Sequence, residues 1–241
     1  MTDSTDSALI EARGLVAGYR GRPVLGPLDL ALGSTGTLAL VGPNGVGKST
    51  LLKTLCGVLP PLSGELTFAA KPVAASAVYV HARRGLVLVG EHRANVLRSL
   101  TVTENLALAS AHHRRGDFDA FTVFPRLGER RRQQAGTLSG GELQMLALAM
   151  ALALEPRCLL LDEPSAGLAP IVLADVHSTL NELRRRRLCM IVAEQRPDVV
   201  RGLCDRVAIV GGGTLGYLDP DTDLSGEALG AAYFSTDHTT G

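Results

Sequence analysis

Tryptophan is absent from the 241-residue sequence, and aromatic residues make up only 4% of it. So few aromatics argue against a platform for single-stranded nucleic acid, because such platforms stack bases on aromatic rings. An excess of positive charge is missing as well, since 24 basic residues balance 24 acidic ones. Binding along a phosphate backbone depends on clustered positive charge. We therefore expect no nucleic-acid partner.

Hydrophobic runs long enough to cross a membrane are also missing. The longest apolar stretch, residues 143–154, is interrupted by Gln144, and a spanning helix needs about 20 apolar residues. The acidic, polar start of the chain is unlike a secretory signal. The four cysteines form no C-x-x-C pair, which predicts a reduced chain without a disulfide framework or a zinc site. Any role at a membrane would then depend on partner subunits.

What the sequence does contain is enough apolar material for a core, since 46% of its residues are hydrophobic. Strand-like and helix-like segments alternate, which favours an α/β fold. The apolar runs 158–161 and 189–193 show no alternation, as is typical of parallel strands covered on both faces. The other predicted strands are 9–16, 27–32, 37–41, 65–68, 86–89 and 206–210, and a helix is predicted over 48–55.

The segment from about 92 to 155 differs, because its patterns are helical and no strand stands out. We interpret it as a helical lobe inserted into an α/β core that comprises about 9–91 and 156–218. Residues 219–241 are interpreted as a C-terminal tail. The helices expected in the lobe are 103–111, a region around 117–124, and 141–154.

A glycine-rich segment between the strand 37–41 and the helix 48–55 fits the phosphate-binding pattern G-x-x-x-x-G-K-[ST]. Its glycines let backbone N–H groups turn toward phosphate oxygens, and the helix N-terminus adds a positive dipole end. Lys48, one of only three lysines in the chain, can reach the β- and γ-phosphates, and Ser49 can ligate Mg²⁺. We expect Lys48 to face solvent, so that its loss costs little stability. The residues are Gly42, Pro43, Asn44, Gly45, Val46, Gly47, Lys48, Ser49 and Thr50.

Two acids, Asp162 and Glu163, close the apolar strand 158–161. Carboxylates at the end of a buried strand are costly unless they serve a metal or a proton. We interpret Asp162 as a Mg²⁺ ligand and Glu163 as the group that polarises an attacking water. The alternative interpretation is a strand that leads into a helix cap, since Asp-Glu-Pro-Ser resembles a helix start.

A serine followed by two glycines opens the apolar helix predicted over 141–154. Exposed N–H groups at such a helix start form a second anion cradle, although a simple N-cap with a glycine hinge explains the same residues. The segment comprises Ser139, Gly140, Gly141 and Glu142, and it begins about 90 residues after Lys48.

In this order, the three motifs resemble those of the ABC-type ATPases, over roughly residues 9–218. The resemblance implies a P-loop domain with a RecA-like core, an antiparallel β subdomain and an inserted helical subdomain. The runs VFPRLGERRRQQAGT (123–137), LSGGELQMLALAMAL (138–152) and LLLDEPSAGLAP (159–170) are similar to the second ATPase subunit of branched-chain amino acid importers. Urea and short-chain amide importers use very similar subunits.

The resemblance also implies roles for single residues. Tyr19 matches the aromatic residue that stacks on adenine, although it could be an ordinary tyrosine at a strand edge. Glu91 matches the position of a glutamine that contacts the metal, and Gln195 stands where most relatives carry a switch histidine. The alternative for Gln195 is a helix cap before Pro197. Ala169 stands where many relatives carry an aspartate.

By the same resemblance, the chain binds ATP and Mg²⁺, and its hydrolysis of ATP powers solute import, with branched-chain amino acids as the expected solutes. Ser139 to Glu142 would complete the site of a partner ATPase. The implied partners are a sister ATPase or a second copy, two membrane permeases and an external solute-binding protein, at the cytoplasmic face of the membrane. The ATPase of an exporter or another non-importer system remains an alternative.

Overall fold

Two sheets organise the protein, and the computed structural model describes them within residues 8–93, 95–111 and 118–218. The expected tail 219–241 lies outside the described residues. The first sheet is antiparallel and has the strand order β2-β1-β4-β5. Arg20 and Gly21, both at positive φ, form the two-residue turn between β1 and β2. The strands are β1 (Ile10–Tyr19), β2 (Arg22–Leu32), β4 (Ser63–Phe68) and β5 (Lys71–Pro72).

The second sheet has the order β10-β9-β3-β8-β7-β6, with every neighbouring pair parallel except β10 and β9. The interiors of its parallel strands are apolar because both faces are covered, and polar residues stand only at strand ends. In β3, Leu38 and Leu40 enter one core while Ala39 and Val41 enter the other. The strands are β3 (Thr37–Val41), β6 (Leu86–Val89), β7 (Cys158–Asp162), β8 (Cys189–Glu194), β9 (Arg206–Gly211) and β10 (Thr214–Leu218).

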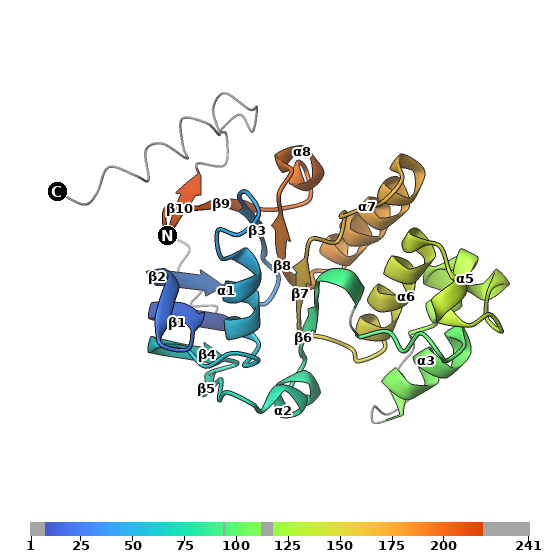
Figure 1. Cartoon of the computed structure of the whole chain (residues 1–241), viewed down its shortest axis with the longest axis horizontal. Coiled ribbons are helices and arrows are strands. Elements are labelled where there is room, and N and C mark those ends of the chain that lie inside the picture. Colours follow the sequence, from blue (N-terminus) through green and yellow to red (C-terminus); the bar gives the residue numbers. More distant parts are fainter. Residues whose placement is uncertain (1–7, 94, 112–117, 219–241) are drawn as a thin grey trace, which may run out of the picture.

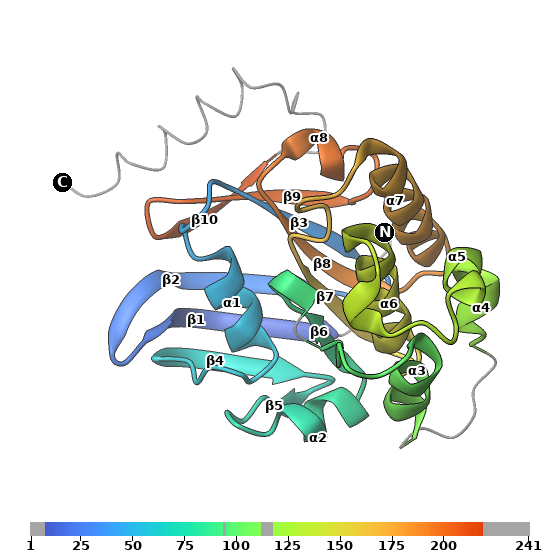
Figure 2. The same cartoon turned by 45° about the vertical axis from the view of Figure 1, so that its right-hand side comes forward.

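Helices lie on both sides of the parallel sheet, as Figure 1 shows. Helix α1 (Lys48–Leu55) packs between the two sheets, and its residues Leu51 and Leu52 are fully buried there. Helices α6 (Gly140–Leu152) and α7 (Pro170–Arg185) cover the opposite face. The molecule is thus layered as antiparallel sheet, helix, parallel sheet and helices, an arrangement that can be followed in Figure 1 and Figure 2.

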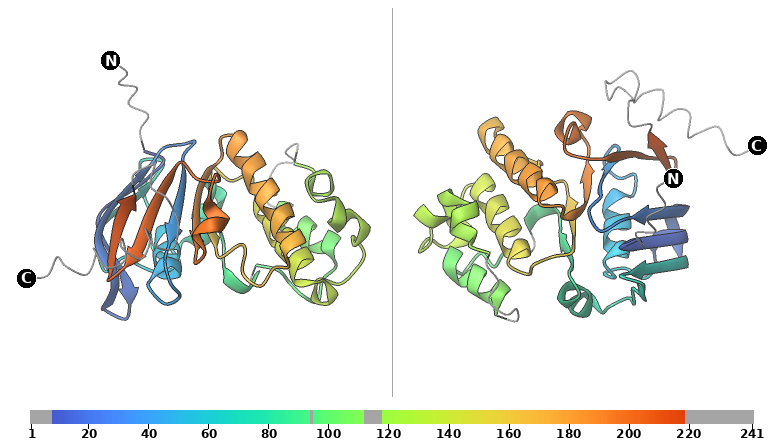
Figure 3. Two further views of the ribbon diagram at one scale, coloured as in Figure 1. Left: turned by 90° about the horizontal axis from the view of Figure 1, so that it is seen from above. Right: turned by 180° about the vertical axis from the view of Figure 1, so that it is seen from behind.

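Between β6 and β7, all named elements of the described chain are helices, apart from one isolated bridge between Thr101 and Gln134, and Figure 3 shows these helices grouped on the side away from the antiparallel sheet. Their apolar faces join the core that α6 shares with the parallel sheet. This arrangement confirms the predicted α/β fold class with its antiparallel and helical subdomains. The helices are η1 (Glu91–Arg93), α3 (Val102–Ser110), α4 (Ala120–Val123), α5 (Pro125–Glu129), η2 (Ala135–Thr137) and α6.

Some elements escape the sequence prediction. The predicted limits 37–41, 48–55 and 86–89 agree with the structure, but α2 (Val78–Arg83), β5 and β10 were not predicted. A further short helix, α8 (Pro197–Val200), follows β8. None of the described helices is long and apolar enough to cross a membrane.

The strand order decides which loops meet. Strand β8 lies between β3 and β7, and all three run in the same direction. Their carboxyl ends therefore share one edge of the sheet, where Val41 pairs with Glu194 and Asp162 pairs with Ala193. In open α/β sheets this edge is where ligands bind.

Candidate nucleotide-binding site

The loop between β3 and α1 is shaped by its glycines. Gly45 and Gly47 adopt positive φ values of 84° and 111°, which side-chain-bearing residues rarely adopt. A Cβ on Gly42 would lie 2.4 Å from the carbonyl oxygen of Val210, so only glycine fits there. Gly47 is the N-cap of α1 and offers no side chain to cap it. The first N–H groups of a helix have no intrahelical partner, so this end is suited to an anion.

Lys48 is buried, and the expectation of a solvent-facing side chain is wrong. Only 4% of its surface is exposed. Its Nζ donates to the carbonyl oxygens of Gly42 and Pro43 at 2.7 and 2.9 Å, and it lies 3.5 Å from the Glu163 carboxylate. The loop curls around the ammonium group, so the carbonyls that would otherwise need water become its acceptors.

Asp162 and Ser49 meet across the sheet edge. The Ser49 hydroxyl donates to the Asp162 carboxylate at 2.9 Å. Burial raises the pKa of Asp162 above its usual value, and the Glu163 and Glu91 carboxylates add to this, while the Ser49 hydrogen bond and the charge of Lys53 oppose it. A hydroxyl and a carboxylate oxygen thus lie together, as a hard cation requires.

Glu163 follows Asp162 in a backbone conformation that is unusual for a residue with a side chain. Its φ is 48°, in the left-handed region, which costs of the order of 1–3 kcal/mol and persists only where neighbours enforce it. Its N–H donates to the Ala193 carbonyl at 2.9 Å, and its own carbonyl accepts from the Ala166 N–H at 3.1 Å. Strain held in this way is common at functional sites.

Two cavities adjoin these residues. The first, of about 220 Å³, is lined by loop residues 44–45 and 47–50 together with Glu91 and Glu163. The second, of about 230 Å³, is lined by Glu91, Asp162 and Glu163 and by residues of the helical lobe such as Gln144. The structure therefore brings the predicted residues Lys48, Ser49, Glu91, Asp162 and Glu163 together around adjoining spaces.

Tyr19 and Gln195 lie at the margin of this group. Tyr19 is 41% exposed at the end of β1, and its hydroxyl accepts a hydrogen bond from Thr50 at 3.4 Å. Gln195 is exposed directly after β8. The helix-cap alternative for Gln195 is wrong, because the N-cap of α8 is Arg196. The helix-start alternative for Asp162 and Glu163 is wrong as well, because the next helix begins only at Pro170.

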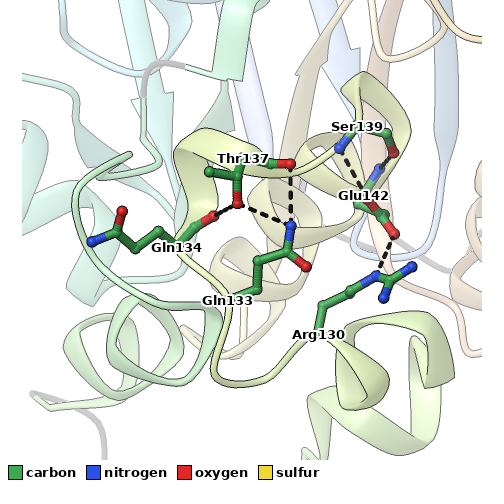
Figure 4. A network of polar contacts seen from close by, with 6 residues as sticks. All are labelled: Arg130, Gln133, Gln134, Thr137, Ser139 and Glu142. Carbon is green, nitrogen blue, oxygen red and sulfur yellow. Dashed lines mark hydrogen bonds and ion pairs between the residues drawn. The ribbon is translucent and has the colours of Figure 1, made fainter.

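The segment Ser139 to Glu142 lies elsewhere, at the start of α6, and lines neither cavity. Ser139 Oγ accepts from the Glu142 N–H at 3.2 Å, while the Glu142 carboxylate accepts from the Ser139 N–H at 2.9 Å and contacts Arg130 (Figure 4). The cap interpretation is therefore correct for the isolated chain. It leaves the cradle interpretation open, because Ser139 and Gly140 are exposed and the Ser139 hydroxyl can still donate its proton.

Comparison with known proteins agrees with this geometry. The family model described as ABC transporter matches residues 25–166. The chain belongs to this family. A branched-chain amino acid transport ATP-binding protein, BraG of Pseudomonas aeruginosa, is 39% identical over 183 residues, which cover 74% of this chain and 78% of BraG. As a member, the chain is an ATP-hydrolysing subunit of a transporter that has membrane components.

Two further similarities extend over nearly the whole ABC ATPase. The lipopolysaccharide export protein LptB of Escherichia coli K12 is 29% identical over 238 residues, covering 95% of this chain and 98% of LptB. A crystal structure of a nucleotide-free ATP-binding cassette superposes with a TM-score of 0.77 at 21% identity and covers 95% and 96% of the two chains. The latter similarity concerns the fold alone.

The structure of this ABC ATPase also reveals site residues that the sequence prediction missed. Arg93 donates to Gln144 at 2.9 Å and to the Ala166 carbonyl at 3.1 Å, which joins the helical lobe to the loop after Glu163. Ser165 donates twice to the buried Glu194. An acid that closes an apolar strand is the signal that identified Asp162, and Glu194 carries the same signal. Nothing in the sequence points to the Arg93 contacts.

Proposed function

We propose that the ATP of this subunit lies with its phosphates on the α1 N-terminus. Support comes from the uncapped helix start, the left-handed glycines Gly45 and Gly47, and Lys48, whose ammonium already faces the cavity-lining acid Glu163. Lys48 would exchange the carbonyls of Gly42 and Pro43 for phosphate oxygens. The exposed ring of Tyr19 would stack on adenine.

For Mg²⁺, we propose Ser49, Asp162 and Glu91 as the surrounding groups. Mg²⁺ prefers oxygen ligands and usually takes one or two carboxylates together with phosphate oxygens and waters. The hydroxyl of Ser49 and the carboxylate of Asp162 are already in contact, and Glu91 lines both adjoining cavities. When bound, the ion supplies charge compensation for the phosphates.

Glu163 is the proposed group that orients and polarises the attacking water. It lines both cavities and is held in a strained conformation next to Asp162. Gln195, at the same sheet edge, would sense the γ-phosphate through amide hydrogen bonds, without a change of protonation. Ser139, Gly140, Gly141 and Glu142 would complete the nucleotide site of a partner ATPase, because they lie outside the cavities of their own chain.

Replacing Glu163 by Gln tests the proposed catalytic role. We expect unchanged Mg-ATP affinity and a loss of turnover of about 10²–10⁴-fold, the range for a general base. Calorimetry on the isolated chain and steady-state ATPase rates in the assembled transporter measure the two quantities. Glu182→Gln removes an exposed carboxylate of α7 that pairs with Arg185, and serves as the control. Turnover of Glu163→Gln close to that of the wild type would refute the role.

For the transport step, we propose import of branched-chain amino acids through separate permeases, with the subunit at the cytoplasmic face of the membrane. The similarity to BraG supports this solute class. The similarity to LptB, which covers more of the chain at lower identity, supports an exporter as the second candidate. The ATPase partner is a sister subunit or a second copy, and the importer reading adds two permeases and an external binding protein.

Uptake measurements distinguish the two candidates. Vesicles or cells that contain the subunits co-purifying with this chain should accumulate radiolabelled leucine, isoleucine or valine in an ATP-dependent manner, and the Glu163→Gln variant should abolish uptake. Co-purification without an external binding protein, together with no uptake, would favour the exporter.

We also propose the boundaries 9–91 and 156–218 for the core and 92–155 for the lobe, with 219–241 as the tail.

A further inference from the structure

Glu194 is the most deeply buried acid at the sheet edge, with 2% of its surface exposed. It closes β8, the strand that lies between β3 and β7. Its carboxylate accepts two hydrogen bonds from Ser165, one from the backbone N–H at 3.0 Å and one from the hydroxyl at 2.8 Å. The backbone N–H and the hydroxyl of Ser165 thus both donate to the Glu194 carboxylate.

The hydrogen bonds from Ser165 to Glu194 extend the contact between β7 and β8 beyond the last pair of residues in their backbone register. Asp162 pairs with Ala193, and the N–H of Glu163 then donates to the Ala193 carbonyl. The chain turns at Glu163, which has a left-handed φ, and Pro164 has no N–H, so the next backbone donor is the N–H of Ser165. The Glu194 carboxylate supplies the acceptor that it reaches. It therefore anchors the loop directly after the residue with the unusual backbone.

The backbone of Glu194 contacts the phosphate-binding loop as well. Its carbonyl oxygen accepts from the N–H of Gly42 at 3.3 Å, and it pairs with Val41 in the sheet register. The residue after it is Gln195. One buried acid is thus linked to the start of the phosphate-binding loop, to the loop that carries Glu163 and to the proposed γ-phosphate sensor.

A buried carboxylate is an expensive way to hold a loop. Burial penalises its charge and raises the pKa of Glu194, against the opposing effect of the Ser165 hydrogen bonds. A buried acid contributes little to stability compared with a well-packed apolar side chain. An apolar residue would suit the strand, since the preceding residues of β8 are apolar and fully buried. The carboxylate is best explained by what it positions.

The opposite side of the same loop is held by the helical lobe. Arg93 donates from Nη2 to the carbonyl oxygen of Ala166 and from Nε to Gln144 of α6. The loop is consequently fixed to the sheet through Ser165 and to the lobe through Ala166. The carbonyl of Glu163 meets the Ala166 N–H between these two anchors.

We propose that Glu194 is a positioning residue for ATP hydrolysis, which fixes Ser165 and thereby the orientation of the Glu163 carboxylate. It acts through Ser165 and does not touch the nucleotide. The inference rests on the catalytic role proposed above for Glu163. Loss of the Glu194 side chain should lower kcat without weakening the binding of Mg-ATP, because the phosphate-binding residues keep their own contacts.

Three variants separate the hydrogen bonds from the charge. Glu194→Ala leaves both donors of Ser165 without their acceptor. Glu194→Gln keeps the geometry, because its amide oxygen can accept from the Ser165 N–H and its amide nitrogen can donate to the rotated hydroxyl. Ser165→Ala removes one of the two bonds and leaves Glu194 in place, so it remains informative if Glu194→Ala does not fold.

Turnover in the assembled transporter is the first readout. We expect kcat to fall by about 10²-fold in Glu194→Ala, the scale of a displacement of about 1 Å in a catalytic group. In Ser165→Ala, kcat should fall by a smaller factor, and Glu194→Gln should keep most of the wild-type kcat. Mg-ATP affinity of the isolated chain, measured by calorimetry, should change by less than a factor of two to three in all three variants.

Amide hydrogen exchange of the isolated full-length chain is the second readout. The N–H groups of Ser165 and Ala166 should exchange faster in Glu194→Ala, and those of α1 should not. Leu30→Ala, which removes a buried side chain in the antiparallel sheet, is the matched control for a general loss of stability. It should lower the melting temperature without lowering kcat at 25 °C.

The outcomes distinguish this inference from the role of Glu163. Wild-type kcat in Glu194→Ala overturns the inference, whereas wild-type kcat in Glu163→Gln overturns the catalytic assignment itself. Equal losses of kcat in Glu194→Ala and Glu194→Gln would show that the charge matters and not the anchoring, which also overturns it. A similar loss of kcat in Leu30→Ala would mean that a general loss of stability is enough to lower kcat. Glu194 would then have a structural role only, which also overturns the inference.

Discussion

Two helices of this protein begin with glycine-rich segments, and their N-termini are prepared in opposite ways. Helix α1 begins after Gly47, which provides no cap, and the lysine at its first position is folded back onto loop carbonyls. Helix α6 begins after Ser139, whose hydroxyl and N–H form a reciprocal capping box with Glu142. The first end is open to an outside anion, whereas at the second end the N–H groups of Ser139 and Glu142 already have side-chain acceptors.

The difference shows what each end can do without a partner chain. The α1 end needs an anion to complete its hydrogen bonds, and the surrounding residues Ser49, Asp162 and Glu163 converge on it. The α6 end is stable as it stands, yet the Ser139 hydroxyl can still donate its proton while it accepts from Glu142. Such an end is suited to meet a phosphate presented by another chain.

Removing Lys48 should have the largest effect on the α1 end. Lys48→Ala loses charge-assisted bonds to phosphate, which predicts a drop in Mg-ATP affinity of about 10²–10⁴-fold. It also leaves two loop carbonyls without their donor, so the unfolding free energy should fall by about 1–3 kcal/mol. Calorimetry and chemical denaturation measure the two effects. Lys71→Ala, on the exposed strand β5, is the control, and unchanged affinity in Lys48→Ala would sink the proposed phosphate site.

Substitutions of Gln195 test whether this residue senses the γ-phosphate at the sheet edge. Gln195→Ala should slow hydrolysis by roughly one to three orders of magnitude, the range for the loss of a transition-state donor. Gln195→His should retain substantial activity, and only this variant should gain a rate dependence between about pH 5 and 8, because imidazole titrates there. Steady-state rates across pH in the assembled transporter decide the matter. A wild-type rate for Gln195→Ala would exclude a sensor role.

Ser139 tests the closed state of the α6 end. Ser139→Ala removes the acceptor for the Glu142 N–H, and the loss of an N-cap costs about 1 kcal/mol of stability. Ser139→Thr keeps the hydroxyl and should retain most of the stability. Urea denaturation measures both variants. No difference between Ser139→Ala and the wild type would mean that the capping box contributes nothing to folding.

Glu142 should make the smallest contribution, and it should depend on pH. The Ser139 N–H, followed by smaller effects of the Ser139 hydroxyl and Arg130, lowers the pKa of Glu142 below its usual value. A lowered folded-state pKa adds stability above the unfolded-state pKa of about 4.3, and this stability is lost as the pH falls through the folded-state value. The stability advantage of the wild type over Glu142→Gln should therefore shrink below about pH 4.3. A constant difference between pH 7 and 3 would contradict this.

Local sequence patterns predicted the phosphate-binding loop and the helix α1 that follows it well. The apolar strand 37–41, the glycines and the helix 48–55 follow from nearest neighbours along the chain, and the structure has these limits. The burial of Lys48 did not follow, because it depends on how the loop folds its own carbonyls around the ammonium. The role of Glu194 depends on β8 lying between β3 and β7, and strand order is a property of the whole fold.

Short elements with weak patterns were missed for a related reason. Helix α2 exposes Val78, Tyr79 and Val80, so its apolar residues do not mark a buried face. Strand β5 has two residues, too few for a periodic signal. In contrast, the capping box at Ser139 and Glu142 can be read directly from the sequence, because its partners are three residues apart.

The central claim is that the α1 end binds the ATP of its own chain and the α6 end acts on that of a partner. Ser139→Ala tests it most directly when Mg-ATP affinity of the isolated chain and ATPase turnover of the assembled transporter are measured side by side. We predict affinity within a factor of two of the wild type and turnover reduced by roughly 10-fold or more, as for the loss of a phosphate-directed donor. Affinity reduced as strongly as in Lys48→Ala, or turnover equal to the wild type, would contradict the account.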